Sequence, residues 1–276
     1  MDEQKVKVKS KLLTYYEQAQ KTNTLASVTI ELTNKCNWRC KHCYIPSYTN
    51  HGFSLSFLES LFKDLRNMGV LNLVFTGGEM FLRDDVLDIV KIAREMFFRV
   101  TILSNASLLD EKTVAKLSKL HISEYSLTIF STNEELHDKI SCVKGSFEKA
   151  MNGVRLLKKY NIPVEIKTPL IDDNKFEFGK ISEFCKKEGV KFLSNPSIMC
   201  KSDGDISPSE LRVSDADLEE VFLGLREIFP ENEFKRIYNK NASPCSILKH
   251  TLSIDCYGNV HPCNSYFYKV GNIKAA

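Results

Sequence analysis

Short apolar runs alternate with amphipathic segments over residues 27–195, and this alternation limits the folds that the chain can adopt. The apolar runs have the length of strands, and the segments between them repeat apolar residues at helical spacing. Strands that alternate with helices form right-handed βαβ units around a parallel sheet. We therefore predict an α/β protein, either an open doubly wound sheet or a partial barrel, and both architectures place ligands at the carboxyl ends of the strands. The predicted strands are 27–32, 71–76, 99–104, 124–130, 163–170 and 190–195, and the predicted helices are 55–69, 84–97, 110–120, 146–160 and 175–189.

The composition disfavours several classes of protein. The 276 residues are 43% hydrophobic and 26% charged, and the net charge of +3 is too small for us to predict a nucleic-acid partner. The basic run at residues 5–11 fits a solvated arm. No apolar run approaches the ~18 residues of a membrane span, and the N-terminus lacks the apolar core of a signal peptide. We therefore expect a cytoplasmic protein with no membrane partner.

The pattern changes past residue 200, where we place a domain boundary. A polar loop leads to a further helix at 215–229, an edge strand at 230–239 and a β-hairpin at 250–263 that turns at residues 257–259. We predict three regions, which are an N-terminal arm or helix at 1–26, the α/β region at 27–200, and a linker helix with a small β region at 201–276.

Nine cysteines need an explanation, because a reducing compartment disfavours structural disulfides. Cys142, Cys185 and Cys200 are scattered and fit inert buried thiols, whereas the other six gather near the two ends, as metal ligands do. The segment CNWRCKHCY at 36–44 follows the first predicted strand and has the spacing C-x3-C-x2-C. Three thiolates are one ligand short of a closed zinc or iron–sulfur site. The fourth ligand is a distant residue, the adjacent His42 after a sharp fold-back, or a position left open for something else to bind.

Polar residues also follow the next predicted strands. TGGE at 76–79 ends the second strand, where Gly77 and Gly78 either let the backbone approach a ligand closely or only turn the chain. Glu79 carries a carboxylate that suits an ammonium group. The other candidates at strand ends each have a purely structural alternative, such as bonding to the backbone. They are Ser104, Asn105, Ser126, Lys167 and Thr168.

The cysteine segment and TGGE together resemble the signature of the radical S-adenosylmethionine (SAM) superfamily. The resemblance implies a partial (β/α)6 TIM-like barrel and a [4Fe–4S] cluster whose fourth iron is free for the amino and carboxylate groups of SAM. Met80 stands where the family often has proline, and a zinc knuckle is the alternative interpretation of the cysteines. The implied cluster ligands are Cys36, Cys40 and Cys43. The implied SAM contacts are His42 near the adenine, Gly77, Gly78 and Glu79 at the methionyl amino group, Ser104 and Asn105 at the carboxylate or ribose, and Ser126.

The resemblance also implies the reaction. The reduced cluster passes one electron to SAM, and cleavage gives methionine and a 5′-deoxyadenosyl radical that abstracts a hydrogen atom from the substrate. A flavodoxin- or ferredoxin-type protein is the implied electron donor. The abstraction needs no acid–base pair, which agrees with our finding no convincing nucleophile triad or carboxylate pair in the sequence.

The stretch HDKISCVKGSF at 137–147 resembles one that is common in a branch of this superfamily. His137 or Asp138 could touch substrate or SAM, or the stretch could only cap the helix predicted from Ser146. Cys142 within it is a candidate hydrogen-atom donor.

The C-terminal cysteines indicate which branch this is. Cys245, Gly258 and Cys263 have the spacing C-x12-G-x4-C, which resembles the opening of a SPASM or Twitch extension. That extension carries auxiliary iron–sulfur clusters in enzymes that modify peptides. The further cysteines of the complete pattern are missing before residue 276, so we expect a fragment or shortened variant, or a reduced auxiliary site in which Cys256 joins the other two. A zinc or redox pair of Cys245 and Cys263 is the remaining alternative.

Three functions are consistent with these motifs. The first is maturation of a ribosomally made peptide, by a thioether, a carbon–carbon crosslink or a similar change. Only 26 residues precede the first predicted strand, so peptide recognition would need a separate protein or another surface. The second is maturation of a sulfatase, a quinone-type cofactor or another small molecule by the same chemistry. The third is an iron–sulfur or zinc binding protein without turnover.

Overall fold

Nine strands form a single sheet in the computed structural model, which describes residues 11–229 and 249–274. The strand order is β6-β5-β4-β3-β2-β1-β7-β8-β9, and β1 to β6 are parallel neighbours in chain order. Because these six strands are parallel, their carboxyl ends meet at one rim. Their bounds are β1 (Ser27–Glu31), β2 (Asn72–Thr76), β3 (Arg99–Ser104), β4 (Glu124–Thr128), β5 (Val164–Pro169) and β6 (Lys191–Asn195).

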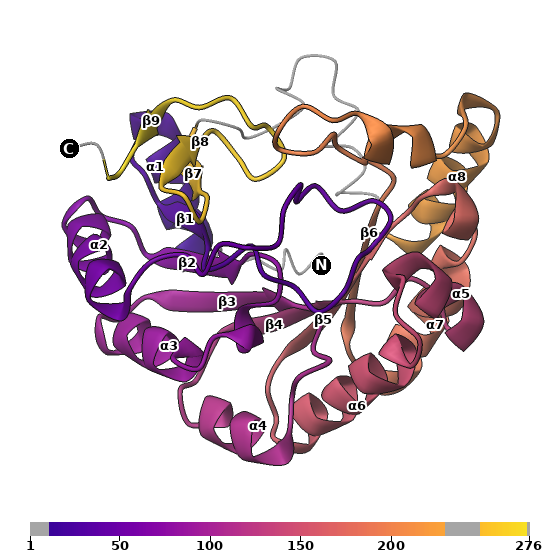
Figure 1. The fold of residues 1–276 in the computed structure, drawn as a ribbon, viewed down its shortest axis with the longest axis horizontal. Helices are drawn as coiled ribbons and strands as arrows, with labels where there is room; N and C mark the ends of the chain where they lie inside the picture. The colour runs from indigo at the N-terminus through magenta and orange to yellow at the C-terminus, as the bar shows by residue number, and fades with distance from the viewer. Residues whose placement is uncertain (1–10, 230–248, 275–276) are drawn as a thin grey trace, which may run out of the picture.

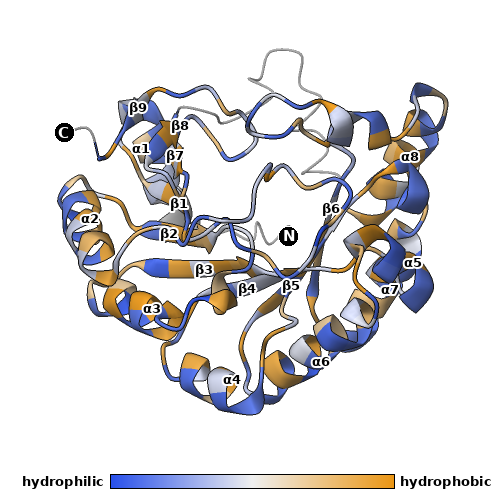
Figure 2. Cartoon of the chain, in the orientation of Figure 1, coloured by the Kyte–Doolittle hydropathy of each residue, from blue (hydrophilic) through white to orange (hydrophobic). Residues whose placement is uncertain are grey.

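Helices follow these strands and cover the outer side of the curved sheet, as Figure 1 shows. Figure 2 shows hydrophilic residues on the outward side of α6, away from the sheet. In α2, buried residues recur every three or four positions, and the Ser54 side chain caps the helix by accepting from the Phe57 N–H. The helices are α2 (Leu55–Asn67), α3 (Val86–Glu95), α4 (Glu111–Ser118), α5 (Glu134–Ser141), α6 (Ser146–Lys159), α7 (Phe178–Glu188) and α8 (Asp215–Ile228), with α1 (Lys11–Thr22) before β1 and short 3-10 helices at Met80–Leu82, Asp172–Asn174 and Ser207–Leu211.

The barrel is open, and a C-terminal hairpin extends the sheet from its first strand. β6 forms one edge of the described sheet, while β7 (Thr251–Ile254) pairs in parallel with β1. β8 (Asn259–His261) then returns antiparallel to β7, and β9 (Gly271–Asn272) pairs with β8. The prediction of a partial barrel with a small C-terminal β-hairpin extension is thus confirmed. The hairpin turns through Gly258, whose φ of +95° is a conformation that favours glycine.

Two predictions have a different outcome. Helix α5 overlaps the start of the stretch 137–147, which we expected only to touch ligand or to cap the next helix; the Asn133 side chain accepts from the Leu136 N–H and starts a helix of its own. The edge strand predicted at 230–239 lies outside the described residues, as does Cys245. The division of the chain at residue 200 stays a prediction.

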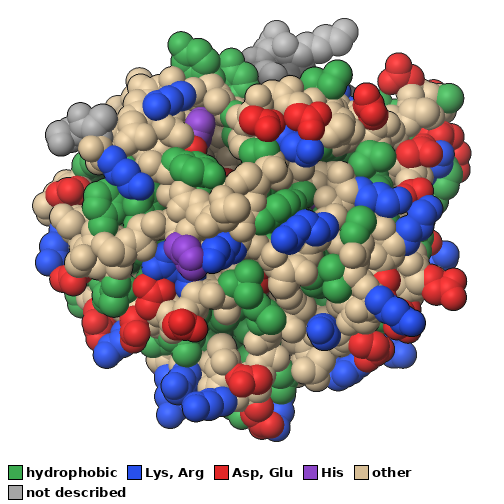
Figure 3. Space-filling view, viewed as in Figure 1, with side chains coloured by type: hydrophobic (Ala, Val, Ile, Leu, Met, Phe, Trp, Pro, Cys, Tyr) green, Lys and Arg blue, Asp and Glu red, His purple; other side chains and the backbone are tan. Residues whose placement is uncertain are grey.

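The described helices show no membrane span, since none of them is both long enough and apolar enough to cross a bilayer. Figure 3 shows the face onto which the loop after β1 projects, and the described basic and acidic side chains are interspersed on it.

Candidate functional site

A cavity of about 340 Å³ opens at the carboxyl ends of the parallel strands. One wall is the loop after β1, which carries the three N-terminal cysteines and His42. The opposite walls come from the ends of β2 to β5 and from the segment 197–199. The fold therefore brings the cysteine motif and the residues that follow four other strands to one place.

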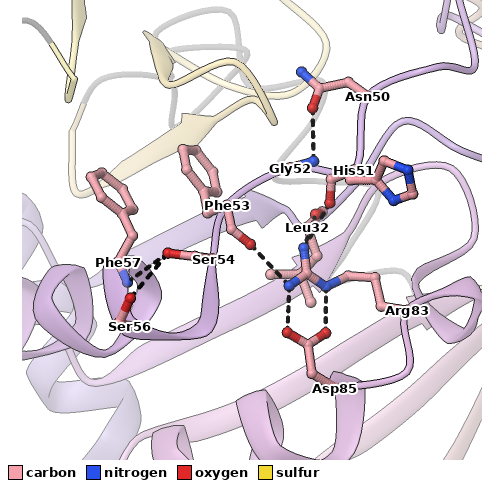
Figure 4. Close-up of polar contacts among 10 residues, drawn as sticks. All are labelled: Leu32, Asn50, His51, Gly52, Phe53, Ser54, Ser56, Phe57, Arg83 and Asp85. Atoms are coloured by element: carbon pink, nitrogen blue, oxygen red, sulfur yellow. Dashed lines mark hydrogen bonds and ion pairs between the residues drawn. The ribbon is translucent and has the colours of Figure 1, made fainter.

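Arg83 holds the two ends of the cysteine loop together (Figure 4). Its guanidinium donates hydrogen bonds to the carbonyl oxygens of Leu32 (3.0 Å), His51 (2.7 Å) and Phe53 (2.9 Å). Asp85 accepts two further bonds from it, at 2.9 and 2.7 Å. Because its partners lie at both ends of the loop, Arg83 fixes where residues 32–53 begin and end. The sequence alone gave no reason to select this residue.

Gly77 and Gly78 attach the TGGE turn to the start of the same loop. A Cβ at residue 77 would lie 2.1 Å from the Thr33 carbonyl oxygen, and one at residue 78 would lie 2.1 Å from that of Lys35. The Gly78 N–H donates to Thr33 O (2.8 Å), and the Glu79 N–H donates to Lys35 O (2.7 Å). Both glycines also line the cavity. The close backbone approach that the sequence predicted is therefore an approach to the chain segment that leads into Cys36.

Glu79 does not line the cavity, and its carboxylate bonds to residues that do. The side chain is fully buried and accepts hydrogen bonds from the Ser104 hydroxyl (2.9 and 2.8 Å), the Asn105 N–H (2.8 Å) and the Phe81 N–H (3.0 Å). Burial raises its pKa. In this structure Glu79 joins the end of β2 to the end of β3, and its contact with an ammonium group stays a prediction.

Asn105 extends this polar network to the cysteine loop. Its side-chain amide donates to Asn37 Oδ1 (2.9 Å), and its own Oδ1 accepts from the Ser107 hydroxyl (2.7 Å). Asn37 in turn donates to the Ser107 hydroxyl (2.8 Å). Asn37 directly follows Cys36, so this closed ring of hydrogen bonds positions the first cysteine against β3. Ser104 and Asn105 both line the cavity.

The three N-terminal cysteines come together at the cavity. All three are half-buried and line it. Cysteine thiolates are the usual ligands of iron–sulfur clusters. Burial raises the pKa of Cys36 to about 11 and also raises those of Cys40 and Cys43, so the thiolates need the positive charge of bound metal.

His42 lies in an aromatic group on one side of the cavity. Its ring meets the Phe130 ring edge-on at 5.2 Å, and its Nδ1 is buried without a partner in the described structure. Burial lowers its pKa to about 4, so the imidazole is neutral. His137 packs behind this group against Trp38 (5.5 Å) and accepts from the Phe130 N–H (3.2 Å). His137 does not line the cavity and therefore supports the wall instead of contacting a ligand.

The stretch 137–147 supports the cysteine loop and caps a helix. The carbonyl oxygens of Ser141 and Ile140 accept from the N–H groups on either side of Cys40, at 3.1 and 3.0 Å. Asp138 accepts from the N–H of Gly145 (2.5 Å), the hydroxyl of Ser146 (2.7 Å) and the N–H of Phe147 (2.9 Å), which is a cap on α6. The capping alternative therefore accounts for Asp138.

Cys142 is exposed and does not line the cavity. It ends α5 in the left-handed conformation, with φ of +57°. Its role as a hydrogen-atom donor stays a prediction.

Of the remaining predicted residues, two line the cavity and one bonds to the backbone behind it. Ser126 lines the cavity and donates to Glu165 (3.0 Å), which forms an ion pair with Lys167 at 3.3 Å. Lys167 lines the cavity as well. Thr168 is buried and donates to the Ile129 carbonyl (2.7 Å), so its hydroxyl bonds to the backbone.

The described C-terminal cysteines do not form a cluster of ligands. Cys256 is buried after β7, and burial raises its pKa to about 12. Cys263 is half-buried beyond β8, where its sulfur accepts from the Ser265 N–H (3.2 Å). No third described His, Cys, Asp or Glu side chain completes a metal site with these two, and Cys245 lies outside the described residues.

Comparison with known proteins agrees with this arrangement. A family model described as the Radical SAM superfamily matches residues 30–185. The chain is 27% identical over 217 residues to an AdoMet-dependent heme synthase of Methanosarcina barkeri, covering 78% of this chain and 61% of the relative. It is 26% identical over 263 residues to the antilisterial bacteriocin subtilosin biosynthesis protein AlbA of Bacillus subtilis, covering 89% of this chain and 56% of the relative. The chain thus spans less than two thirds of the length of both relatives.

A solved structure shares the fold. Streptococcus suis SuiB bound to precursor peptide SuiA superposes with a TM-score of 0.65 at 16% identity, over 92% of this chain and 64% of SuiB. At this identity the likeness shows the fold alone.

Proposed function

The chain belongs to the radical SAM superfamily, and on this premise we propose that it cleaves SAM reductively and uses the resulting radical to modify a ribosomally made peptide. One observation carries the proposal. The three cysteines, the glycine turn after β2 and the ends of β3 and β4 line the same cavity, although they come from four separate parts of the chain. A binding protein without turnover would need the cysteines but not the glycine turn or the ends of β3 and β4 beside them.

The residues of this cavity would have separate roles. Cys36, Cys40 and Cys43 would hold a [4Fe–4S] cluster. When bound, this cluster would supply the electron that cleaves SAM to methionine and a 5′-deoxyadenosyl radical, which abstracts hydrogen from the substrate. The cysteine loop is held by backbone and side-chain hydrogen bonds on three sides, so the thiols are oriented before any ligand binds.

SAM would lie between the cysteine loop and the strand ends. The neutral His42 ring and Phe130 provide an apolar wall for the adenine. Gly77 and Gly78 leave the backbone of the TGGE turn accessible to the polar end of SAM, and Ser126 offers a hydroxyl on the opposite side. Glu79 would act only through Ser104 and Asn105, because its carboxylate is already satisfied.

A peptide is the substrate class that the relatives favour. AlbA is named for bacteriocin biosynthesis, and SuiB was solved with a precursor peptide. A small molecule is the second candidate, because the heme synthase relative covers 78% of this chain at similar identity. The electron donor would be a flavodoxin- or ferredoxin-type protein, and a separate protein could present the peptide.

An auxiliary cluster stays a prediction that depends on Cys245 and Cys263. Iron and sulfide counts in a Cys36/Cys40/Cys43 triple alanine variant test it. Iron that remains in this variant supports the auxiliary cluster, and a variant without iron removes it.

The substrate class is tested with the reconstituted chain, SAM, dithionite and short precursor peptides encoded beside its gene. We expect one peptide to lose two hydrogen atoms by mass spectrometry, as a thioether or carbon–carbon crosslink requires, and to raise the yield of 5′-deoxyadenosine. Modification of a porphyrin or a sulfatase in place of every peptide would refute the peptide assignment and leave SAM cleavage intact.

A further inference from the structure

A second cavity, of about 350 Å³, lies on the other side of the cysteine loop from the first. It is bounded by that loop, by the C-terminal hairpin and by the segment that follows the hairpin. Tyr44, Ile45 and Asn264 line both cavities, so the two are separated by shared walls. The two cavities are therefore immediate neighbours.

The carboxylate of Glu31 is buried against this second cavity. Glu31 is the last residue of β1 and is 7% exposed. The Tyr44 hydroxyl donates to its Oε1 at 2.7 Å, and the backbone of Cys256 also hydrogen-bonds to the carboxylate. No Lys or Arg in the described parts of the chain forms an ion pair with it. A buried carboxylate without a cationic partner is costly, and a cation in the cavity would relieve that cost.

His261 lines the same cavity and has one ring nitrogen without a partner among the described residues. The residue is 7% exposed, and its Nε2 lies 3.1 Å from Asp255 Oδ2. A carboxylate oxygen accepts hydrogen bonds, so the neutral ring carries its proton at Nε2 and leaves Nδ1 as an acceptor. Nδ1 is buried and has no hydrogen-bond partner in the described structure. The Asp255 carboxylate already accepts from the Tyr257 N–H and from the N–H and side-chain amide of Asn259.

Aromatic rings form the side of this cavity next to the first one. Tyr44 stacks on Phe267 with ring centroids 5.4 Å apart. Tyr257 also lines the cavity, and the exposed Lys269 and Asp203 add one charge of each sign at its edge. Rings beside carboxylates suit a cation, because the faces of aromatic rings attract positive charge.

We propose that this second cavity binds a guanidinium or primary ammonium group, supplied by an arginine or lysine side chain of the substrate peptide. Such a group donates several hydrogen bonds and accepts none, which matches the Glu31 carboxylate and the unpaired ring nitrogen of His261. The assignment to a peptide side chain rests on the proposed function. It gives the shared wall at Tyr44 a role, because one residue of the peptide would be held in this cavity while a neighbouring residue reacts in the first.

The test uses three small probes and the full chain, loaded anaerobically with its cluster and kept without dithionite. Calorimetric titration compares butylguanidine, which carries one guanidinium, with butylamine, which carries one primary ammonium, and with butylurea, which is the neutral counterpart of butylguanidine. We expect a cationic probe to bind at least about tenfold more tightly than butylurea. Tighter binding of butylguanidine identifies an arginine site, and tighter binding of butylamine a lysine site.

Matched variants locate the binding. Glu31→Gln keeps the shape and removes the charge, and we expect it to weaken the better cationic probe by about tenfold or more. Glu124→Gln removes an acid that pairs with Lys191 outside both cavities, and it should leave binding unchanged. His261→Phe removes the unpaired ring nitrogen, and probe binding to this variant tests the same cavity if the Glu31 variant does not fold. Equal binding of the neutral probe, or full binding by both cavity variants, overturns the inference.

Two further measurements separate this inference from the proposed function. SAM cleavage that proceeds normally in a protein that binds neither cationic probe refutes the cation site alone. Tight, Glu31-dependent binding in a protein that never cleaves SAM supports the cation site and refutes the proposed reaction. The Cys36/Cys40/Cys43 triple alanine variant gives a further check. If it retains iron and no longer binds the probes, a second cluster occupies the cavity and the inference is overturned.

Discussion

Replacement of Gly78 by alanine tests how the cysteine loop is attached to the barrel. The new Cβ would lie 2.1 Å from the Lys35 carbonyl oxygen and 2.6 Å from its carbon. Since Cβ atoms stay at least 3.0 Å from other atoms, the two segments must separate by about 0.9 Å. The obstacle is backbone, so no side-chain rotation can relieve it. The same movement stretches the bond from the Glu79 N–H to Lys35 O, now 2.7 Å, beyond hydrogen-bonding distance.

These two effects set the expected magnitude. Overpacking of a closed contact costs about 1–3 kcal/mol, and the lost hydrogen bond costs about 1 kcal/mol more. We therefore expect Gly78→Ala to lower the free energy of unfolding by about 2–4 kcal/mol. With a slope of about 2–3 kcal/mol per molar urea, the midpoint of unfolding should fall by about 1 M. Lys35 directly precedes Cys36, so less iron per chain should be held after reconstitution.

The chain offers its own control. Gly179 lies inside α7 and has nothing within 4 Å of the position that a Cβ would take. Gly179→Ala should raise the free energy of unfolding by about 0.5–1 kcal/mol and leave the iron content unchanged. If Gly78→Ala unfolds at the same urea concentration as the parent chain and holds the same iron, the proposed attachment through the glycines is wrong.

Four further predictions follow from single side chains. Glu79→Ala leaves three buried donors without an acceptor and should cost about 2–4 kcal/mol in urea unfolding; a loss below about 1 kcal/mol would show that the carboxylate does not brace the strands. Asp138→Ala removes the cap of α6 and should lower stability by about 1–2 kcal/mol without changing the yield of 5′-deoxyadenosine, which a ligand contact would change. Burial raises the pKa of the Glu31 carboxyl from 4.5 to about 7, so its contribution to the free energy of unfolding is full below pH 4.5 and is lost as the pH rises through about 7. Glu31→Gln should remove about 3 kcal/mol of this decline from a plot of stability against pH, and an unchanged plot would contradict the raised pKa. Cys142 is exposed and does not line the cavity, so Cys142→Ser should leave substrate modification intact by mass spectrometry; loss of product would support its predicted role as a hydrogen donor.

The fold could be predicted from the sequence because each parallel strand and each covering helix leaves a local pattern. Strands buried on both faces appear as apolar runs, and helices with one buried face repeat at their own period, as 55–69 does. Helix α5 had a signal as well, since Asn133 precedes two acidic residues in the way that helices begin. Its eight residues are too few for a helical repeat of apolar positions to stand out.

The orientation of side chains could not be predicted in the same way. The motif TGGE indicates which residue types meet at a strand end, but the direction of the Glu79 carboxylate depends on Ser104 and Asn105, which belong to another strand. Arg83 bonds to backbone carbonyls that are 30 or more residues away, so no local pattern marks it. The second cavity likewise joins Glu31 to residues of the C-terminal hairpin, which only the completed sheet brings together.

The central claim is that the cavity at the cysteine loop cleaves SAM. The most direct measurement reconstitutes the chain anaerobically with iron and sulfide, adds dithionite and SAM, and quantifies 5′-deoxyadenosine by chromatography. We predict slow formation of 5′-deoxyadenosine even without a substrate, and none in Cys40→Ala. A chain that carries a complete [4Fe–4S] cluster and yields no 5′-deoxyadenosine would contradict the account.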